Sequence, residues 1–215
     1  MMHVFKRFHM VQNQITNIMA RIEQKRFANE RFMIAIAGPP GAGKTTLGQA
    51  LVNELADTTI AHYVPMDGFH LDNDTLRGLG WFDRKGAPQT FDALGVVAAV
   101  SDLRHNQETV SLPAFDRAKD ISIPDVIRIP PAPDCVVVEG NYLLLTDAPW
   151  KQLASQFDLT IFLSPSKDIL RERLIQRWLD HGMTFAAAHA RAAGNDIPNA
   201  QFILDHSMHA DMFFQ

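Results

Sequence analysis

The chain has 215 residues, of which 47% are hydrophobic and 20% are charged, a composition typical of one globular domain with a sizeable core. A formal net charge of −4 argues against a general nucleic-acid-binding protein, because the phosphate backbone requires a basic face. The one cysteine, Cys135, excludes an intramolecular disulfide, and no apolar run approaches the length of a membrane span. We therefore expect a cytoplasmic protein with a single domain over residues 1–215, whose partners are small molecules and neither nucleic acid nor a membrane.

Residues 1–30 precede the first predicted strand and form an N-terminal helical extension. Apolar side chains recur there every three or four residues with polar side chains between them, which is the pattern of an amphipathic helix. The apolar positions are Val11, Ile15, Ile18, Met19 and Ile22. We expect this helix to pack against the core; a helix that lies on a membrane surface or binds a partner is the alternative.

A glycine-rich segment joins a predicted buried strand, residues 32–37, to a predicted helix, residues 46–55. Residues 38–45 match the phosphate-binding pattern G-x-x-x-x-G-K-[ST] at every required position. In such a loop the backbone N–H groups surround a phosphate, Lys44 reaches the β- and γ-phosphates, and the Thr45 hydroxyl binds Mg²⁺. The residues expected to contact the nucleotide are Gly38, Pro39, Pro40, Gly41, Ala42, Gly43, Lys44, Thr45 and Thr46. The alternative is an ordinary turn between a strand and a helix.

An aspartate follows the second predicted strand, residues 60–66. Ligands of open α/β sheets bind beyond the carboxyl ends of the strands, so Asp67 would point into the same crevice as the glycine-rich loop. It is the candidate general base for an acceptor hydroxyl, and a turn-forming aspartate before Gly68 is the alternative. Residues 71–90 are rich in glycine, aspartate and basic residues and are expected to form active-site surface, after which Asp92 would cap a helix.

Three further strands are predicted, at residues 110–117, 135–140 and 158–163, and we expect the first to lead into a charged loop through Pro124. Glu139 ends the apolar run of the second of these strands. A carboxylate in that position needs compensation, which Mg²⁺ held jointly with Thr45 would provide. The alternative is an acid whose oxygens accept hydrogen bonds from nearby backbone N–H groups.

The last third of the chain is predicted to be mainly helical. One helix begins at Ser164–Pro165 and ends at His181–Gly182, and a second covers about residues 184–193. A break at residues 194–198 and a short polar tail follow. Strands and helices thus alternate along the chain, which predicts an α/β fold with a parallel sheet.

Two arginines lie four residues apart on the first of these helices. Arg173 and Arg177 share one helix face and would suit a lid that closes over phosphates, whereas a solvated face paired with neighbouring acids is the alternative. His206 and His209 near the end of the chain give only weak support for a metal site.

A P-loop alone does not separate ATPases, GTPases, transporter modules and small-molecule kinases, so the other motifs must decide. They read Met-Asp-Gly-Phe-His at 66–70, Arg-Lys-Gly at 84–86, Pro-Ala-Phe-Asp-Arg at 113–117 and Glu-Gly-Asn-Tyr-Leu-Leu at 139–144. Together with the P-loop and the Arg173/Arg177 helix, they span residues from about 33 to 200. In its set of motifs and in their order along the sequence, the chain resembles the phosphoribulokinase/uridine kinase family of P-loop kinases.

The resemblance implies a P-loop fold with a five-stranded parallel sheet flanked by helices, a helical lid over about residues 164–193, ATP as donor, Mg²⁺, and a small-molecule hydroxyl acceptor. It also implies that Asp67 is the base, and that Lys44, Arg173 and Arg177 are catalytic. The residues implied to border the acceptor are Phe69, His70, Arg84, Lys85, Phe115, Asp116, Arg117, Asn141 and Tyr142.

The acceptor itself is less constrained. Within the family the chain is similar to bacterial fructose transport system kinases and nucleoside kinase family proteins, so a sugar such as fructose is the first expectation and a nucleoside the second. The loop at residues 113–117 departs from the Pro-x-Tyr-Asp-x pattern of uridine kinases and from the pantothenate kinase pattern. Pantothenate and a regulatory, non-kinase ATP-binding module remain alternatives, and the resemblance leaves a homodimer open.

Overall fold

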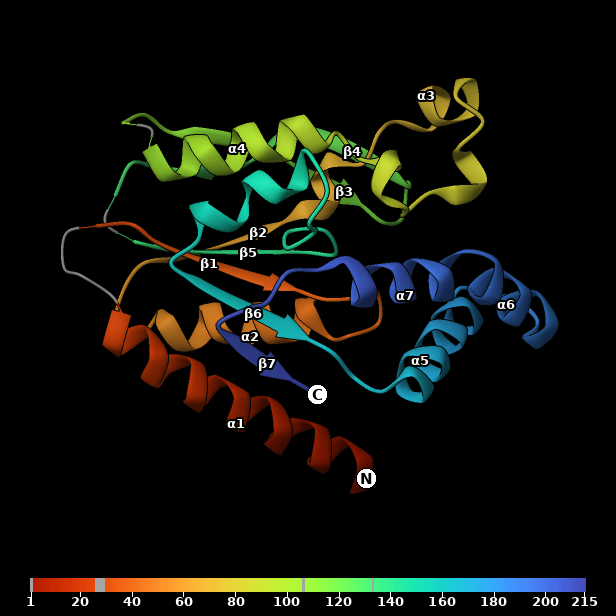
Figure 1. Cartoon of the computed structure of the whole chain (residues 1–215), viewed down its shortest axis with the longest axis horizontal. Coiled ribbons are helices and arrows are strands. Elements are labelled where there is room, and N and C mark those ends of the chain that lie inside the picture. Colours follow the sequence, from red (N-terminus) through yellow and green to blue (C-terminus); the bar gives the residue numbers. More distant parts are fainter. Residues whose placement is uncertain (1, 26–29, 106, 133) are drawn as a thin grey trace.

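A computed structural model of the chain describes residues 2–25, 30–105, 107–132 and 134–215. Its centre is a five-stranded sheet in the order β2-β5-β1-β6-β7, and all neighbouring strands in it are parallel (Figure 1). The strands are β1 (Phe32–Ala37), β2 (Ala61–Pro65), β5 (Cys135–Gly140), β6 (Leu159–Leu163) and β7 (Met212–Phe214). The prediction of an α/β fold with a five-stranded parallel sheet is confirmed.

The two central strands form because β1 is apolar along its whole length and β5 is apolar except at Glu139 near its end. Every residue of β1 and of β5 is buried, as expected for parallel strands whose two faces are both covered. Their register pairs Ile36 with Glu139 and Ala37 with Gly140, so both strands end at the same edge. This edge places the P-loop after β1 next to the acidic end of β5.

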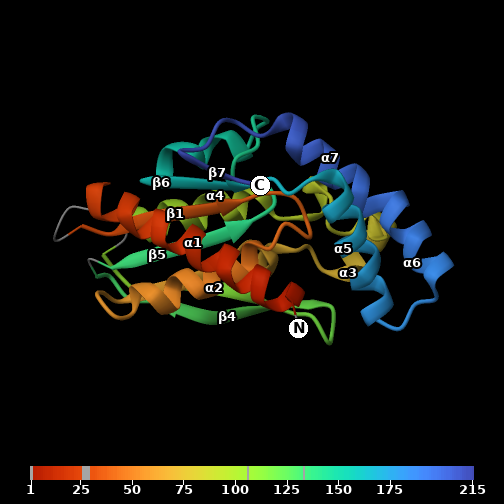
Figure 2. The same cartoon turned by 90° about the horizontal axis from the view of Figure 1, so that it is seen from below.

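Helices and a hairpin cover the two faces of the sheet. Helices α1 (Met2–Lys25) and α2 (Lys44–Leu55) lie on one face, and α4 (Ala93–His105) lies on the other (Figures 1 and 2). Each face of the sheet has its own hydrophobic core, and successive residues of β1 point into opposite cores. Ile34 packs in the core under α1 and α2, whereas Ala35 packs in the core under α4. In α1 the residues Ile15, Ile18 and Ile22 are buried, which confirms the prediction of a helix packed on the core.

The short remaining elements connect these layers. They are α3 (Asn73–Gly78) and the single-turn helices η1 (Met66–Phe69), η2 (Phe82–Arg84), η3 (Pro88–Thr90), η4 (Trp150–Gln152) and η5 (Ala154–Gln156). Asp92 precedes α4 and accepts a hydrogen bond from the backbone N–H of Gly95 at 2.9 Å, as a helix cap does. Within the described ranges, no helix combines the length and the apolar character needed to span a bilayer.

A second, two-stranded sheet replaces the predicted charged loop. Strand β3 (Val110–Asp116) pairs antiparallel with β4 (Ile121–Ile129), so the expectation of a loop through Pro124 is wrong. Isoleucines at alternate positions favour the strand, and Asp120, with a φ of 55°, turns the chain between the strands. The proline is tolerated because this hairpin has no interior strand.

The C-terminal part also differs from expectation. Its helices, which we call the helical arm (residues 167–206), are α5 (Lys167–Asp180), α6 (Phe185–Arg191), the π-helical turn η6 (Ala192–Asp196) and α7 (Ile197–His206). Helix α5 begins at Lys167 rather than at Ser164–Pro165, because Ser166 accepts the capping hydrogen bond from the N–H of Ile169.

Two further corrections concern the last 22 residues. The segment 194–198 does not break the helical arm, because Pro198 lies in the first turn of α7, where the missing N–H is not needed. The predicted polar tail contains β7, which pairs with β6 and completes the sheet. Beyond the carboxyl ends of β1 and β6, the helical arm lies beside the P-loop edge (Figure 1).

Candidate active site

The P-loop connects β1 to α2 and presents Lys44 at the first turn of that helix. Gly43 adopts a φ of 99°, a left-handed conformation that a glycine takes without strain and that turns the backbone before the helix. The buried Lys44 ammonium donates hydrogen bonds to the Pro39 carbonyl at 3.0 Å and to Oδ1 of Asn141 at 2.8 Å. Thr45 and Thr46 follow in the same turn and are exposed. The loop thus has the form of a phosphate cradle.

Two opposite charges are buried beside this loop. Burial lowers the pKa of Lys44, and the negative charges of Glu139 and Asp67 act in the opposite direction. Burial raises the pKa of Glu139, and the positive charge of Lys44 opposes this rise. Glu139 is only 4% exposed. At the edge where β1, β2 and β5 end, Lys44, Glu139 and Asp67 are therefore near enough for their charges to act on one another.

Oxygen groups near the cradle fit Mg²⁺. Thr45 offers a hydroxyl and Glu139 a carboxylate, and Mg²⁺ in phosphate-transfer sites needs only one or two protein oxygens because waters and phosphates supply the rest. The buried hydroxyl of Tyr63 adjoins Glu139, and burial followed by the charge of Glu139 raises the pKa of Tyr63. The described residues contain no group of three or more His, Cys, Asp or Glu side chains that could hold a metal by themselves.

The two C-terminal histidines bind backbone instead. The Nδ1 atom of His206 lies 2.9 Å from the Phe202 carbonyl oxygen, and that of His209 lies 2.8 Å from the Ala210 carbonyl oxygen. One ring nitrogen of each histidine is therefore taken up by a nearby backbone carbonyl, and the spacing of the two residues gives no support for a metal site.

Asp67 lies in η1, immediately after β2, and its side chain is 27% exposed. The next residue, Gly68, approaches the carbonyl of Pro113 so closely that a Cβ would collide with it, and η1 is thereby packed against β3. One carboxylate oxygen of Asp67 accepts a hydrogen bond from Arg117 at 2.8 Å. The candidate base and one predicted acceptor residue are thus in direct contact.

Three of the predicted acceptor residues form an aromatic and cationic cluster. The ring of His70 lies between Phe91 and Phe115, with centroid distances of 4.0 and 4.7 Å, and burial lowers the pKa of His70. The Lys85 ammonium lies 5.0 Å from the centroid of the Phe115 ring. The sequence interpretation brought these residues together only through the family resemblance.

Two partners of Lys85 were not anticipated. Its ammonium donates to Oδ1 of Asn73 at 2.7 Å and pairs with Oδ1 of Asp120 at 2.9 Å. The Asn73 amide in turn donates to the carbonyl of Asp120 at 3.1 Å. Asn73 and Asp120 lie in surface segments without a sequence motif, so their contact with Lys85 becomes visible only in the folded structure. This network anchors Lys85 to α3 and to the turn between β3 and β4.

The other predicted acceptor residues are engaged elsewhere. Tyr142 is fully buried, packs against Phe91 and Trp150, and donates a hydrogen bond to the Gly86 carbonyl. Phe69 packs against the core on the α4 side, and Asp116 accepts hydrogen bonds from two backbone N–H groups of the hairpin turn. The side chains of these three residues therefore contact the core and the hairpin turn.

The helical arm reaches both the P-loop and the segment 83–86. The Arg173 guanidinium donates to the Gly41 carbonyl at 3.0 Å, whereas the exposed Arg177 lies over the Trp178 ring at 5.6 Å. Arg191 donates to the Asp83 carbonyl at 2.8 Å and Asn195 donates to the Lys85 carbonyl at 3.0 Å. The exposed Arg84 donates back to the arm, to the carbonyl of Gly194 at 3.4 Å. Hydrogen bonds donated in both directions therefore hold the segment 83–86 against the arm.

Comparison with known proteins agrees with this geometry. Residues 33–215 match the family model of the "Phosphoribulokinase / Uridine kinase family". The protein YggC of Escherichia coli K12 is 37% identical over 86% of this chain and 78% of its own length, and a "putative uridine kinase" of Schizosaccharomyces pombe is 32% identical over 86% and 83%.

A solved structure is also similar. The "putative fructose transport system kinase" of Silicibacter sp. TM1040 superimposes with a TM-score of 0.87 and is 41% identical, over 95% of this chain and 98% of that one. A cradle for phosphates, a buried lysine and glutamate, and this extent of similarity lead to one conclusion. The chain belongs to the phosphoribulokinase/uridine kinase family and is a P-loop kinase, a phosphotransferase.

Proposed function

We propose that the protein transfers the γ-phosphoryl group of ATP to a hydroxyl group of a small molecule, with a fructose-like sugar as the preferred class of acceptor. One observation carries this proposal: Asp67, Lys44 and Glu139 converge at the edge of the sheet where the P-loop begins. A nucleotide-binding module that only signals its bound state has no need of a carboxylate placed for an acceptor hydroxyl.

Each residue has a definite part in the proposed reaction. Lys44 and the P-loop N–H groups hold the phosphates, and Thr45 and Glu139 would bind Mg²⁺, which neutralises phosphate charge. Asp67 orients the acceptor hydroxyl and takes its proton as the oxygen bonds to the γ-phosphorus, while the bond to the ADP oxygen breaks. Arg173 and Arg177 would bring positive charge to the transferred group, with residues 164–193 acting as a lid of the single domain 1–215.

The choice of acceptor rests on the relatives. The structure with 41% identity supports a sugar, because its name refers to a fructose transport system. The relative with 32% identity supports a nucleoside as the second candidate, because it is named as a uridine kinase. In either case the cluster of His70, Phe115 and Lys85 would border the acceptor, since its members contact one another near Asp67.

ADP release in the presence and absence of acceptors tests the proposal. We expect purified protein with ATP and Mg²⁺ to release ADP only when a suitable acceptor is added, from a panel of ketoses, aldoses, nucleosides and pantothenate. The matched variant Asp67→Asn should bind ATP like the wild type but lose roughly 100- to 10,000-fold in turnover. ATP hydrolysis at one rate with every acceptor and with none would instead indicate a regulatory ATP-binding module.

A further inference from the structure

The hydroxyl of Tyr63 is a buried polar group whose hydrogen-bonding capacity is unused. Its oxygen is shielded from solvent and makes no hydrogen bond to any residue that the structure describes. A buried hydroxyl without a partner costs free energy, and such groups are few in native proteins. Burial, followed by the charge of Glu139, raises the pKa of Tyr63, so the hydroxyl keeps its proton at neutral pH. The group is therefore a neutral donor that is available to a partner.

The sheet directs the Tyr63 side chain toward Glu139. In the parallel pair of β2 and β5, Tyr63 is opposite Val137 and Pro65 is opposite Glu139. Because side chains alternate along a strand, those of Tyr63, Val137 and Glu139 lie on one face, which is the face that α2 covers. The ring therefore extends along this face to the carboxylate at the end of β5.

A glycine in α2 makes room for this ring. Gly48 is buried and lies one turn after Thr45, and a Cβ at this position would lie 2.8 Å from Cε2 of Tyr63. Glycine is unfavourable inside a helix, so a residue with a side chain would favour α2 itself but would exclude the ring. Helix α2 thus carries an unfavourable residue at a position that lets the tyrosine lie between β2 and the P-loop helix.

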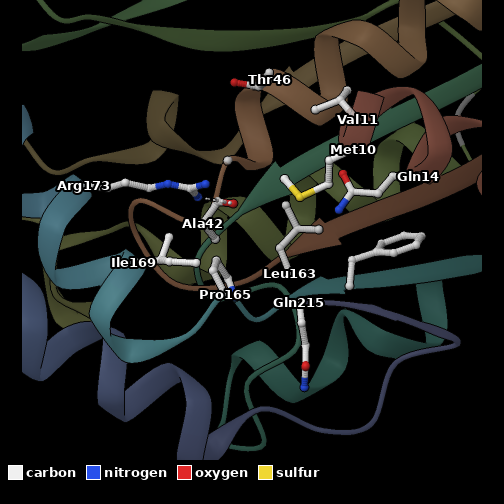
Figure 3. Close-up of a pocket in the computed structure, with 12 residues that line it drawn as sticks. Met10, Val11, Gln14, Ala42, Thr46, Leu163, Pro165, Ile169, Arg173 and Gln215 are labelled. Atoms are coloured by element: carbon white, nitrogen blue, oxygen red, sulfur yellow. Dashed lines mark hydrogen bonds between the residues drawn. The ribbon is translucent and has the colours of Figure 1, made fainter. Parts of the chain in front are cut away.

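Thr45 approaches the same hydroxyl from the P-loop. The two threonines of the loop point to different sides, since Thr46 lines a pocket with Met10 and Leu163 (Figure 3), and Tyr63 is not part of that pocket. Burial and the charge of Glu139 raise the pKa of Tyr63, whereas the side chain of Thr45 acts against this rise. These directions are the ones that a donor on the Thr45 side and an acceptor on the Glu139 side produce.

We propose that Tyr63 is a positioning residue of the Mg²⁺ site and that its hydroxyl joins the two proposed ligands, Thr45 and Glu139. The Thr45 oxygen would offer a lone pair to the ion and donate its proton to the Tyr63 oxygen, while the Tyr63 proton is donated to the Glu139 carboxylate. Such a chain of hydrogen bonds orients both ligands, as outer partners do in other metal sites. The inference rests on the proposed function, because it takes Mg²⁺ with a nucleotide as the group that these residues hold.

Calorimetric titration of ADP at a series of Mg²⁺ concentrations tests this role. Tyr63→Phe removes the hydroxyl and keeps the ring beside Gly48. We expect the Mg²⁺ concentration that half-maximally strengthens ADP binding to rise roughly tenfold, whereas the Kd for ADP in EDTA stays at the wild-type value. A hydroxyl with a purely structural part would leave the Mg²⁺ dependence unchanged, and that result would overturn the inference.

The second of the two tyrosines in the chain is the matched control. Tyr142 is also buried, but its hydroxyl donates a hydrogen bond to the Gly86 carbonyl. Tyr142→Phe should lower Tm by about 2 to 4 °C, because it leaves this carbonyl without its partner, and should keep the wild-type Mg²⁺ dependence of ADP binding. Tyr63→Phe should show no loss in Tm, because it removes a hydroxyl that makes no hydrogen bond within the described structure.

Gly48→Ala tests the geometry and leaves the hydroxyl in place. The added methyl group should displace the Tyr63 ring and raise the Mg²⁺ requirement about as much as Tyr63→Phe does. In the double variant the two effects should not add, because the displaced hydroxyl is already missing. Additive effects would overturn the link between the ring and the metal site. Failure of the wild type to bind ADP, or binding that does not depend on Mg²⁺, would instead overturn the proposed function on which the inference rests.

Discussion

The carboxylate of Asp67 and the guanidinium of Arg117 form an ion pair, with 2.8 Å between Oδ2 and Nη2. The two residues are 50 positions apart, one after β2 and one in the turn after β3. The Arg117 side chain is 59% exposed, so it can move when an acceptor arrives. The hairpin thus supplies the group that holds the candidate base before the reaction.

This pair predicts a selective effect of Arg117→Ala. Without the guanidinium, the carboxylate of Asp67 has lost the partner that orients it toward the acceptor. We expect kcat/KM for the acceptor to fall roughly two- to fivefold, because an exposed ion pair contributes at most about 1 kcal/mol, and KM for ATP to stay unchanged. Steady-state kinetics with each substrate varied in turn measure both values. Lys119→Ala, an exposed change in the same turn, is the control, and an equal loss there would contradict the assignment.

Glu139→Gln tests the metal assignment. The glutamine keeps the size of the buried side chain but lacks the charge that Mg²⁺ would neutralise. We expect the Mg²⁺ concentration for half-maximal ADP release to rise about ten- to a hundredfold, by analogy with lost metal contacts in other sites. A Mg²⁺ titration of both proteins measures the shift. An unchanged Mg²⁺ dependence would leave Glu139 with a purely structural part beside Lys44.

Variants of the exposed Arg171 and Arg177 can show whether α5 acts as a lid over the phosphates or only presents a solvated surface. Arg177 shares a helix face with Arg173, whose guanidinium contacts the P-loop, whereas Arg171 lies elsewhere around the helix. We expect Arg177→Ala to lower kcat about a hundredfold, as the loss of a group that stabilises transition-state charge does. Arg171→Ala should leave kcat at the wild-type value. Equal rates for the two variants would show that the arm does not supply Arg177 to the reaction.

His70 makes stability depend on pH. Burial holds the pKa of His70 below its ordinary value of 6.5, so the folded state resists protonation that the unfolded state accepts. The stabilising contribution is present above pH 6.5 and is lost as the pH falls toward and through the lowered pKa. Urea unfolding at pH 7.5 and 5.5 should show a smaller pH-dependent loss for His70→Gln than for the wild type. The same loss in both proteins would contradict this origin.

Local patterns predicted those parts of the fold that depend on neighbours in sequence. The phosphate loop, the buried strands β1, β5 and β6, and the position of Asp67 after β2 follow from apolar runs and from a motif with fixed spacing. Strand β7 was missed, because three residues at the end of the chain carry no period and become a strand only by pairing with β6. The hairpin strand β4 was missed for a different reason, since Pro124 and Asp125 obscure the alternation of its isoleucines.

The candidate site shows the same division. Lys44 could be chosen from the P-loop motif, and Glu139 and Asp67 from their places at strand ends. Asn73 and Asp120, by contrast, acquire their contact with Lys85 only through folding. The approach of α1 to the P-loop, where Met10 and Ala42 line one pocket, could not be predicted, because the sequence pattern describes this helix only as amphipathic.

The hydrogen bonds from the helical arm to the segment 83–86 limit how this enzyme can change its acceptor. Arg191 and Asn195 bind the carbonyls of Asp83 and Lys85, so their contacts depend on the path of the backbone and not on which side chains that segment carries. A substitution at Arg84, a proposed acceptor residue, removes the bond to Gly194 but leaves the bonds from Arg191 and Asn195 to hold the arm. An insertion or deletion in the segment would shift both carbonyls and disconnect the arm, so the proposed acceptor side tolerates point substitutions far better than changes in loop length.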